Sequence, residues 1–267
     1  MTTHVVADSA TMFRRSLRRM RRYPSLTFFT AGLPVVFLLL FVYVLGGTMG
    51  AGIGGPASAG GARDAYLAYV LPGILLLTVV GVGTGTAISI AMDKTQGIIA
   101  RFRTMSIARA SVLTGHVLGG VVQAFLALAI VVVVAVVVGF RPTTGALSVA
   151  AALGVLALTA IAVAWLSVAM GMAPESVETA SNLPMILTLL LFLSSAFVPT
   201  ASMPEPLRWF AEHQPFTPIA ETLRGLLLGT PIGSDALIAV AWCVVISVAA
   251  FVWAQRLYER LPARPAA

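Results

Sequence analysis

The sequence has few charged residues and almost no cysteine. Only 10% of its 267 residues are Asp, Glu, Lys or Arg, whereas soluble domains carry about 25%. Most of the surface therefore cannot face water, which excludes an ordinary soluble domain. The single cysteine, Cys243, cannot form an intrachain disulfide and lacks the partner ligands that a zinc site requires.

Motifs for catalysis or nucleotide binding are also missing. The sequence contains no G-x-x-x-x-G-K-[ST], no H-E-x-x-H and no G-x-S-x-G. The three histidines, His4, His116 and His213, are far apart along the chain. The glycines at 81, 83 and 85 superficially resemble a phosphate loop, but they lie within an apolar run, where small residues usually serve helix packing. We therefore predict no enzyme activity, no cofactor and no metal in this chain.

Acids and bases in the middle of the apolar segments are essentially missing as well. A carrier driven by protons or ions usually needs such groups near the centre of the membrane. We therefore expect the energy for any transport to come from a separate motor protein.

Long apolar runs are what the sequence does have. Hydrophobic residues make up 58% of the chain, and a membrane-spanning helix takes about 20 of them in succession. We predict an all-α polytopic membrane protein, with a single transmembrane domain over 26–256 between cytoplasmic tails at 1–25 and 257–267. Its six transmembrane helices, of which the fifth is the shortest, are predicted at 26–45, 66–92, 112–138, 146–170, 183–198 and 236–254.

The basic residues predict the orientation in the membrane. They cluster before the first apolar segment, between the second and third, and after the sixth. Six helices place these three clusters on one side, which the positive-inside rule identifies as the cytoplasm. We therefore expect both termini in the cytoplasm of a plasma membrane, in a source that is compatible with a bacterium. The net charge of +7 then reflects topology and lipid contacts, and not nucleic-acid binding.

The residues before the first apolar segment have a helical pattern of their own. Phe13, Leu17, Met20 and Pro24 share one face, and arginines fill the others. This pattern favours an amphipathic helix in the cytoplasmic interface over a positive-inside signal without fixed structure. A cleaved signal peptide is disfavoured because the apolar run is too long. The predicted membrane-surface anchors are Arg14, Arg15, Arg18, Arg19 and Arg22.

Two connecting segments stand out. In 93–109, apolar residues alternate with arginines, which predicts a short cytoplasmic helix that either docks a partner motor or rests on the bilayer. In 194–229, five prolines and an amphipathic run predict a broken, re-entrant hairpin at the outer side, acting as a gate or as a structural lid. The charged residues expected to pair near the outer mouth are Glu205, Arg208, Glu212, Glu221 and Arg224. The outer loop 46–63 is predicted to be flexible.

Several short motifs, in order, carry a family resemblance over nearly the whole chain. They are Arg22-Tyr23-Pro24, Leu33-Pro34, the run at 69–74, Asp93 with Gly97, Arg101-Phe102-Arg103, Ile107-Ala108-Arg109, the run at 192–199, Met203-Pro204, the run at 215–218 and Leu223-Arg224-Gly225. With these motifs the chain resembles the type-2 ABC exporter permeases of the daunorubicin-resistance kind. It departs from them at Ser106, where a proline is common, and at His116, where a basic residue is usual.

The resemblance implies partners and a mechanism. Such permeases assemble as two membrane subunits, identical or related, with two separate ATPase subunits that bind Mg-ATP, and they export drugs, lipids or natural products. The segment 93–109 would then be the coupling helix, contacting the ATPase through Asp93, Gly97, Ile98, Arg101, Phe102, Arg103, Met105 and Ile107. The hairpin 194–229 would close the exit, with Phe197, Pro199, Met203, Pro204 and Phe216 as the outer gate.

Two other readings remain open from the sequence. A polysaccharide or teichoic-acid exporter of the same superfamily would line its channel with stacked aromatics, and the aromatics of this chain are sparse and form no obvious stripe. A membrane scaffold or intramembrane enzyme would need no motor at all. The hypothesis that we carry forward is an exporter permease for a small hydrophobic or amphiphilic molecule.

Overall fold

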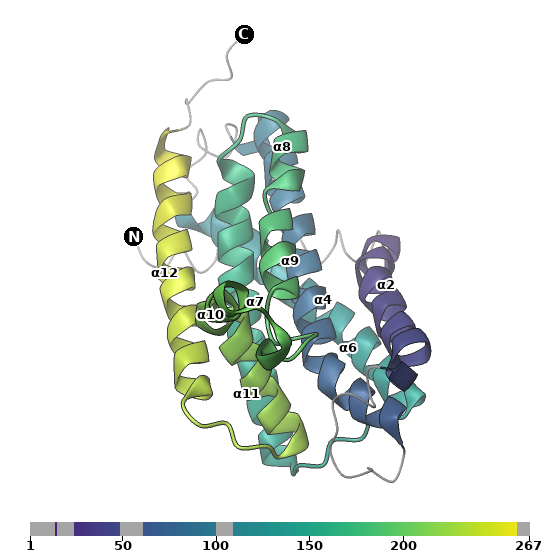
Figure 1. Ribbon diagram of the computed structural model, residues 1–267. Coiled ribbons are helices and arrows are strands. Elements are labelled where there is room, and N and C mark those ends of the chain that lie inside the picture. Colours follow the sequence, from purple (N-terminus) through teal and green to yellow (C-terminus); the bar gives the residue numbers. More distant parts are fainter. Residues whose placement is uncertain (1–13, 15–23, 49–60, 100–108, 261–267) are drawn as a thin grey trace.

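The computed structural model describes residues 14, 24–48, 61–99 and 109–260 (Figure 1). Every regular element in these ranges is helical, which confirms the predicted all-α fold. The elements are α2 (Pro24–Leu40), the π-helical turn η1 (Phe41–Leu45), α4 (Ala62–Thr95), α6 (Arg109–Val138), α7 (Ala146–Met172), α8 (Val177–Asn182), α9 (Met185–Phe192), the 3-10 turn η2 (Thr200–Ser202), α10 (Glu205–His213), α11 (Phe216–Leu228) and α12 (Asp235–Arg260).

Five of the described helical stretches are long and apolar enough to cross a membrane. They correspond to the first, second, third, fourth and sixth predicted segments, and α4, α6, α7 and α12 extend a few residues beyond the predicted ends. The five stretches are Thr30–Thr48, Ala62–Thr95, Ser111–Val138, Ala146–Met172 and Asp235–Arg260.

The fifth predicted segment, 183–198, differs from a simple spanning helix. Its residues belong to a shorter apolar stretch, Val177–Phe192, which is interrupted at Leu183 and Pro184 between α8 and α9. Proline cannot donate the backbone hydrogen bond that would continue α8. The chain therefore reaches only Phe192 before it leaves the helical path.

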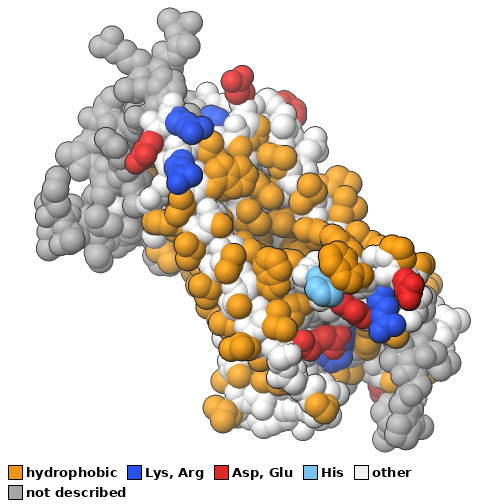
Figure 2. Space-filling model, turned by 60° about the vertical axis from the view of Figure 1, so that its left-hand side comes forward, with side chains coloured by type: hydrophobic (Ala, Val, Ile, Leu, Met, Phe, Trp, Pro, Cys, Tyr) orange, Lys and Arg blue, Asp and Glu red, His pale blue; other side chains and the backbone are white. Residues whose placement is uncertain are grey.

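The central element of the bundle is α4. In its most apolar window 78% of the residues are buried, against 17% to 33% in the other four spans. Helices α2, α6 and α7 pack against it, and α12 packs on α7. These outer helices turn apolar side chains outward, among them Val137, Leu147 and Leu237. Figure 2 shows a face with hydrophobic side chains across its middle and charged side chains gathered towards its two ends. This distribution is that of a protein whose outer surface contacts lipid.

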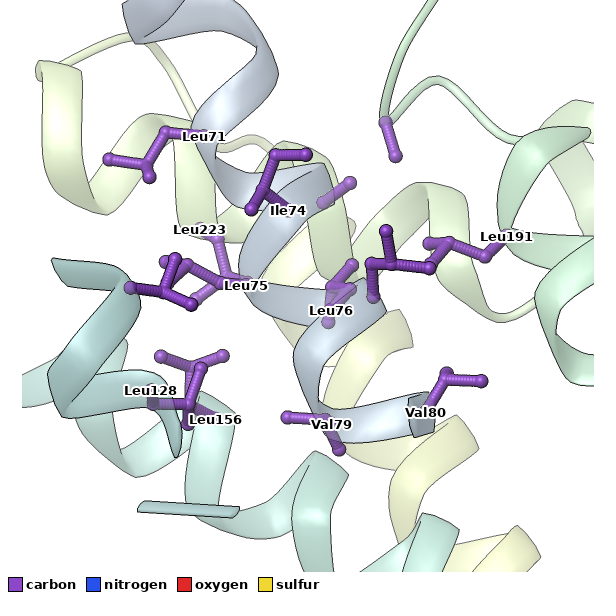
Figure 3. Packing of buried hydrophobic residues seen from close by; sticks show 14 of the residues in the cluster. Leu71, Ile74, Leu75, Leu76, Val79, Val80, Leu128, Leu156, Leu191 and Leu223 are labelled. Carbon is purple, nitrogen blue, oxygen red and sulfur yellow. The ribbon is translucent and has the colours of Figure 1, made fainter. Parts of the chain in front are cut away.

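Close packing holds the bundle together. Lipid is as apolar as leucine, so helices in a membrane associate through van der Waals contact and small residues more than through hydrophobic burial. In Figure 3, leucines of α6, α7, α9 and α11 surround the α4 residues between Leu71 and Val80. Glycines bring the backbones together: a Cβ on Gly83 of α4 would lie 2.6 Å from the hydroxyl of Ser167 on α7.

The chain after α9 does not continue as one spanning helix. Figure 1 shows α9 ending about half-way along the bundle and α11 continuing from there to the end at which α4 begins. At that end the turn between α6 and α7 holds α11: the Thr143 N–H donates to the Leu227 carbonyl over 3.2 Å, and the Thr144 hydroxyl donates to the Leu226 carbonyl over 2.6 Å. Two short helices thus occupy the length that one spanning helix would fill.

Candidate functional site

Side-chain hydrogen bonds stabilise the turn that follows α9 and connect it to α11. The Ser194 hydroxyl donates to the Leu191 carbonyl (2.5 Å) and accepts from the Ala196 N–H (3.1 Å). The Ser195 N–H donates to the hydroxyl of Thr217 on α11 (3.2 Å). Backbone polar groups inside a membrane protein need partners within the protein. The serines and the threonine supply them where the helix stops.

The same threonine closes the corner between α10 and α11. Its hydroxyl donates to the Ala211 carbonyl over 2.5 Å, and the side-chain amide of Gln214 donates to it over 3.3 Å. The side-chain carbonyl of Gln214 accepts the N–H of Phe216 over 3.1 Å. Thr217 therefore contacts both the turn after α9 and the end of α10, so it joins the three parts of this segment.

A buried arginine joins the segment to α4. Arg224 of α11 forms an ion pair with Glu221 (2.6 Å), and its guanidinium also donates to the carbonyls of Ser195 (3.0 Å) and Tyr69 (3.4 Å). The guanidinium carbon lies 4.0 Å from the centre of the Tyr69 ring, and the Tyr69 hydroxyl donates to the same Ser195 carbonyl over 2.9 Å. A charged group in such surroundings is costly unless it is paired, and here the pairing fixes α11 against α4.

The backbone itself comes close at this point. A Cβ on Gly73 of α4 would lie 2.7 Å from the carbonyl oxygen of Ala196. Only glycine allows the turn after α9 to approach α4 this closely. Gly73 follows Pro72, which lies within α4 and is buried with it. The sequence run at 69–74 thus provides the surface of α4 on which the turn rests.

Four aromatic rings pack together where α2 and η1 meet the end of α9. Phe37 of α2 contacts Phe41 (5.8 Å between ring centres) and Phe192 (6.0 Å), and Phe197 contacts Phe41 (5.5 Å) and Phe192 (4.8 Å). Phe41 is the first residue of η1, and π-helical turns are frequent at functional sites. The sequence alone indicated no aromatic cluster, because its members lie some 150 residues apart. The contacts tie α2 to the end of α9.

The predicted outer-gate residues lie in different surroundings. Phe197 and Phe216 are buried in the main hydrophobic cluster. Pro199 and Pro204 precede η2 and α10, and Met203 lies between these two elements. The structure therefore joins two of the five residues to the core and leaves the other three on the connecting segment.

The predicted pairing of the outer charges is confirmed for two pairs. Glu221 pairs with Arg224 as described, and on α10 the guanidinium of Arg208 donates to Glu212 over 2.8 Å. The hydrogen bond from Arg208 holds the pKa of Glu212 below its usual range, and the same bond raises the pKa of Arg208. The first pair includes a buried arginine, whereas both members of the second are exposed.

At the other end of the bundle, three of the residues predicted to contact an ATPase are described. Asp93 is buried, with a carboxylate oxygen 3.3 Å from Nε2 of His116 on α6. Gly97 has a positive φ of 70° and lies in the turn after α4, and Ile98 is half-buried. Arg101, Phe102, Arg103, Met105 and Ile107 lie outside the described residues. Of the predicted membrane anchors, Arg14 is exposed, whereas Arg15, Arg18, Arg19 and Arg22 lie outside the described residues.

The described residues hold no group of three or more His, Cys, Asp or Glu side chains placed to bind a metal ion. Tyr69, Ser195 and Thr217, which carry most of the polar contacts at the turn, were not identified as individual site residues from the sequence. All three belong to motifs of the family resemblance, the runs at 69–74, 192–199 and 215–218, and that was their only signal.

Comparison with known proteins identifies the family. Residues 9–228 match the family described as ABC-2 type transporter. The daunorubicin resistance ABC transporter permease protein DrrB1 of Streptomyces coeruleorubidus is 30% identical over 226 residues, which cover 84% of this chain and 76% of the relative. The probable doxorubicin resistance ABC transporter permease protein DrrC of Mycobacterium tuberculosis is 24% identical over 220 residues, covering 81% and 76%. With its apolar helices, the chain is a multi-pass protein of the bacterial plasma membrane, and it belongs to the ABC-2 type transporter family.

Proposed function

We propose that this chain is the transmembrane permease subunit of an ATP-driven exporter for a hydrophobic or amphiphilic small molecule. Two copies, or one copy with a related permease, would assemble with two ATPase subunits that bind Mg-ATP. Family membership supports the permease role. The 267 residues contain no nucleotide-binding motif, which is consistent with a motor on another polypeptide.

The observation that carries the export mechanism is the divided path after α9. An uninterrupted spanning helix has no joint at which its outer half could move separately from its inner half. Here α11 is a separate element, held by the Ser195–Thr217 hydrogen bond and by the contacts of Arg224 with α4. Such contacts can be exchanged between two arrangements, which is what a gate at one end of a bundle requires. We assign the outer gate to α10 and α11, within the segment 194–229.

This assignment also completes the topology. The stretch Val177–Phe192 together with α11 would make the fifth crossing, and α12 the sixth. At about 1.5 Å per residue the two pieces amount to about 24 Å and 20 Å, enough in sum for a 30 Å hydrocarbon core. Six crossings would put the three basic clusters in the cytoplasm, where the segment 93–109 would contact the ATPase.

The names of the related permeases and the phenylalanine cluster both support an aromatic substrate. The relatives are named for resistance to daunorubicin and doxorubicin, which are planar aromatic amphiphiles. The cluster of Phe37, Phe41, Phe192 and Phe197 offers ring surfaces of the kind on which such molecules stack, and Phe192 is 36% exposed. We therefore take an aromatic amphiphile as the first substrate to test.

The test uses inside-out vesicles or proteoliposomes that contain this chain together with the ABC ATPase of its own source. Daunorubicin, whose fluorescence falls when it is concentrated, serves as the probe. We expect uptake with both subunits and Mg-ATP, and none with an ATPase whose P-loop lysine is replaced. Uphill uptake by the chain alone would refute the proposal. ATP-dependent movement of a labelled glycan instead would favour a polymer exporter, and a complex that moves neither probe would favour a scaffold.

A further inference from the structure

The last turn of α4 carries two adjacent charged residues that contact two different helices. Lys94, the single lysine of the chain, donates from Nζ to the carbonyls of Met172 and Pro174, both over 2.8 Å. Asp93 lies 3.3 Å from His116 of α6. Successive residues of a helix point about 100° apart, so one turn of α4 reaches α7 with one side chain and α6 with the next.

Lys94 suits the end of α7 chemically. The last carbonyls of a helix have no partner within the helix, and they form the negative end of its dipole. Met172 is the last residue of α7, and Pro174 lies two residues beyond it. An ammonium group has three donors and can satisfy two such carbonyls at once. Lys94 thus caps a helix other than its own.

The contact with α6 is shielded from solvent. The side chain of Asp93 is 8% exposed and that of His116 is 14% exposed. The two side chains lie on the helices that flank the segment 93–109: Asp93 is in the last turn of α4, and His116 lies about two turns into α6. The pair therefore links α4 and α6, the two helices that the predicted coupling segment connects.

Packing beneath these contacts is tight. A Cβ on Gly171 of α7 would overlap the carbonyl oxygen of Ala87 and the side chain of Ile90 on α4. Ile99, four residues beyond the end of α4 at Thr95, is 1% exposed and belongs to the hydrophobic cluster that includes Ile90, Val112, Leu113, Val117, Val168, Met172 and Tyr258. The first part of the coupling segment is thus seated in the core of α4, α6, α7 and α12.

We propose that Asp93 and Lys94 are positioning residues that clamp the cytoplasmic ends of α4, α6 and α7 into one rigid unit. A displacement of the segment 93–109 then moves three helices together and not α4 alone. Lys94 contacts α7 and does not bind the ATPase, which instead docks on the segment beyond Gly97. The clamp stays closed throughout the transport cycle. This inference rests on the proposed function, because it states how the push of the ATPase enters the bundle.

The primary test compares Lys94→Met and Lys94→Arg in the complete complex with its ATPase. We expect Lys94→Met to purify with the same amount of ATPase and to hydrolyse ATP, but to move about tenfold less daunorubicin per ATP, a typical size for a coupling energy. Lys94→Arg keeps the charge and the donors and should restore most of the transport. Unchanged transport per ATP in Lys94→Met would overturn the clamp. So would loss of the ATPase from a folded Lys94→Met chain, because that result would make Lys94 a docking residue.

A second pair of variants decides the matter should Lys94→Met fail to fold. His116→Leu removes the contact between His116 and Asp93, and the exchange Asp93→His with His116→Asp restores that contact in reverse. Transport per ATP should fall about tenfold in the single variant and recover in the exchange. Failure of the exchange to exceed the single variant would overturn the pairing. A parent complex that hydrolyses ATP but moves no probe would instead refute the proposed function.

The single lysine also allows a direct test of rigidity. Within this chain, a membrane-impermeant amine-acylating reagent can modify only Lys94 and the N-terminal amine. Mass spectrometry separates these two products from each other and from those of the ATPase. We expect Lys94 to be modified equally slowly in nucleotide-free and vanadate-trapped complexes. A rise of severalfold on trapping would mean that the contacts with α7 open during the cycle, and the rigid clamp would be wrong.

Discussion

Replacing Arg224 by methionine tests whether the buried guanidinium holds α11 against α4. Methionine retains an unbranched apolar chain of similar reach, so packing is largely preserved. What disappears is the charge, with its contacts to Glu221, Ser195 and Tyr69. Glu221 is half-buried at 36% side-chain exposure and can be hydrated once its partner is gone.

The expected loss follows from opposing terms. A hydrogen bond from a charged donor contributes about 1.5–3 kcal/mol, and a desolvated cation–ring contact about 2 kcal/mol. Against these stands the cost of burying the charge, which the substitution relieves. The Nε of Arg224 has no hydrogen-bond partner, which adds to that cost. We therefore expect a net destabilisation of about 2 kcal/mol, or roughly 4–8 °C in Tm for a chain of this size.

The chain supplies its own probe for this measurement. Cys243 is its single cysteine and is 2% exposed, with its sulfur 3.7 Å from the hydroxyl of Thr159 on α7. A dye that becomes fluorescent on reaction with thiols will therefore respond when α7 and α12 separate. Heating the detergent-purified chain with this dye gives Tm without any engineered label.

The matched control is Arg208→Met on α10. Arg208 forms the same kind of pair with a glutamate, four residues away, but both side chains are exposed. Exposed pairs add little to stability, so this variant should melt very close to the parent. Equal melting of Arg224→Met and the parent would refute the reasoning. An equal drop in both variants would do the same, since it would show that loss of surface charge is the cause.

Three further predictions use the same assay. Gly171→Ala should destabilise by about 2 kcal/mol through overpacking, whereas Gly154→Ala, with open space around its Cβ on the same helix, should be neutral. Phe197→Ala, which removes a ring buried to 5% exposure, should cost about 3 kcal/mol; a drop no larger than that of Gly154→Ala would show that the ring cluster does not stabilise the fold. The Arg208 hydrogen bond lowers the pKa of Glu212, so its contribution exists above the usual glutamate pKa of about 4.3 and is lost as pH falls through the lower folded value. Tm of the parent should therefore exceed that of Glu212→Gln slightly at pH 6 and converge with it in acid.

The long helices were predictable because length and apolarity suffice for them. No other element satisfies the backbone across some 20 residues of hydrocarbon, so α4, α6, α7 and α12 were found to within a few residues. The stop at Phe192 was not found. Four of the six residues from Leu193 to Val198 are apolar, so their pattern allows a continuing helix. The turn there depends on Thr217, more than 20 residues further on.

The contacts at the candidate site were predictable only in part. The pairing of Glu221 with Arg224 follows from three-residue spacing on a helix. The contact of Arg224 with Tyr69 does not, because it joins residues 155 positions apart. Likewise the role of Lys94 depends on where α7 ends in space, and periodicity along one segment carries no information about a neighbour.

The split between α9 and α11 bears on how force crosses the subunit. Helices α4, α6, α7 and α12 run unbroken, so we expect a displacement at one end of them to reach the other end almost undiminished. Between α9 and α11 there is no continuous helix, so a force must pass through the hydrogen-bonded contacts at Ser195 and Thr217. We expect that joint to be more compliant than the unbroken helices, so that stiffening it slows opening of the proposed outer gate without changing the binding of the ATPase.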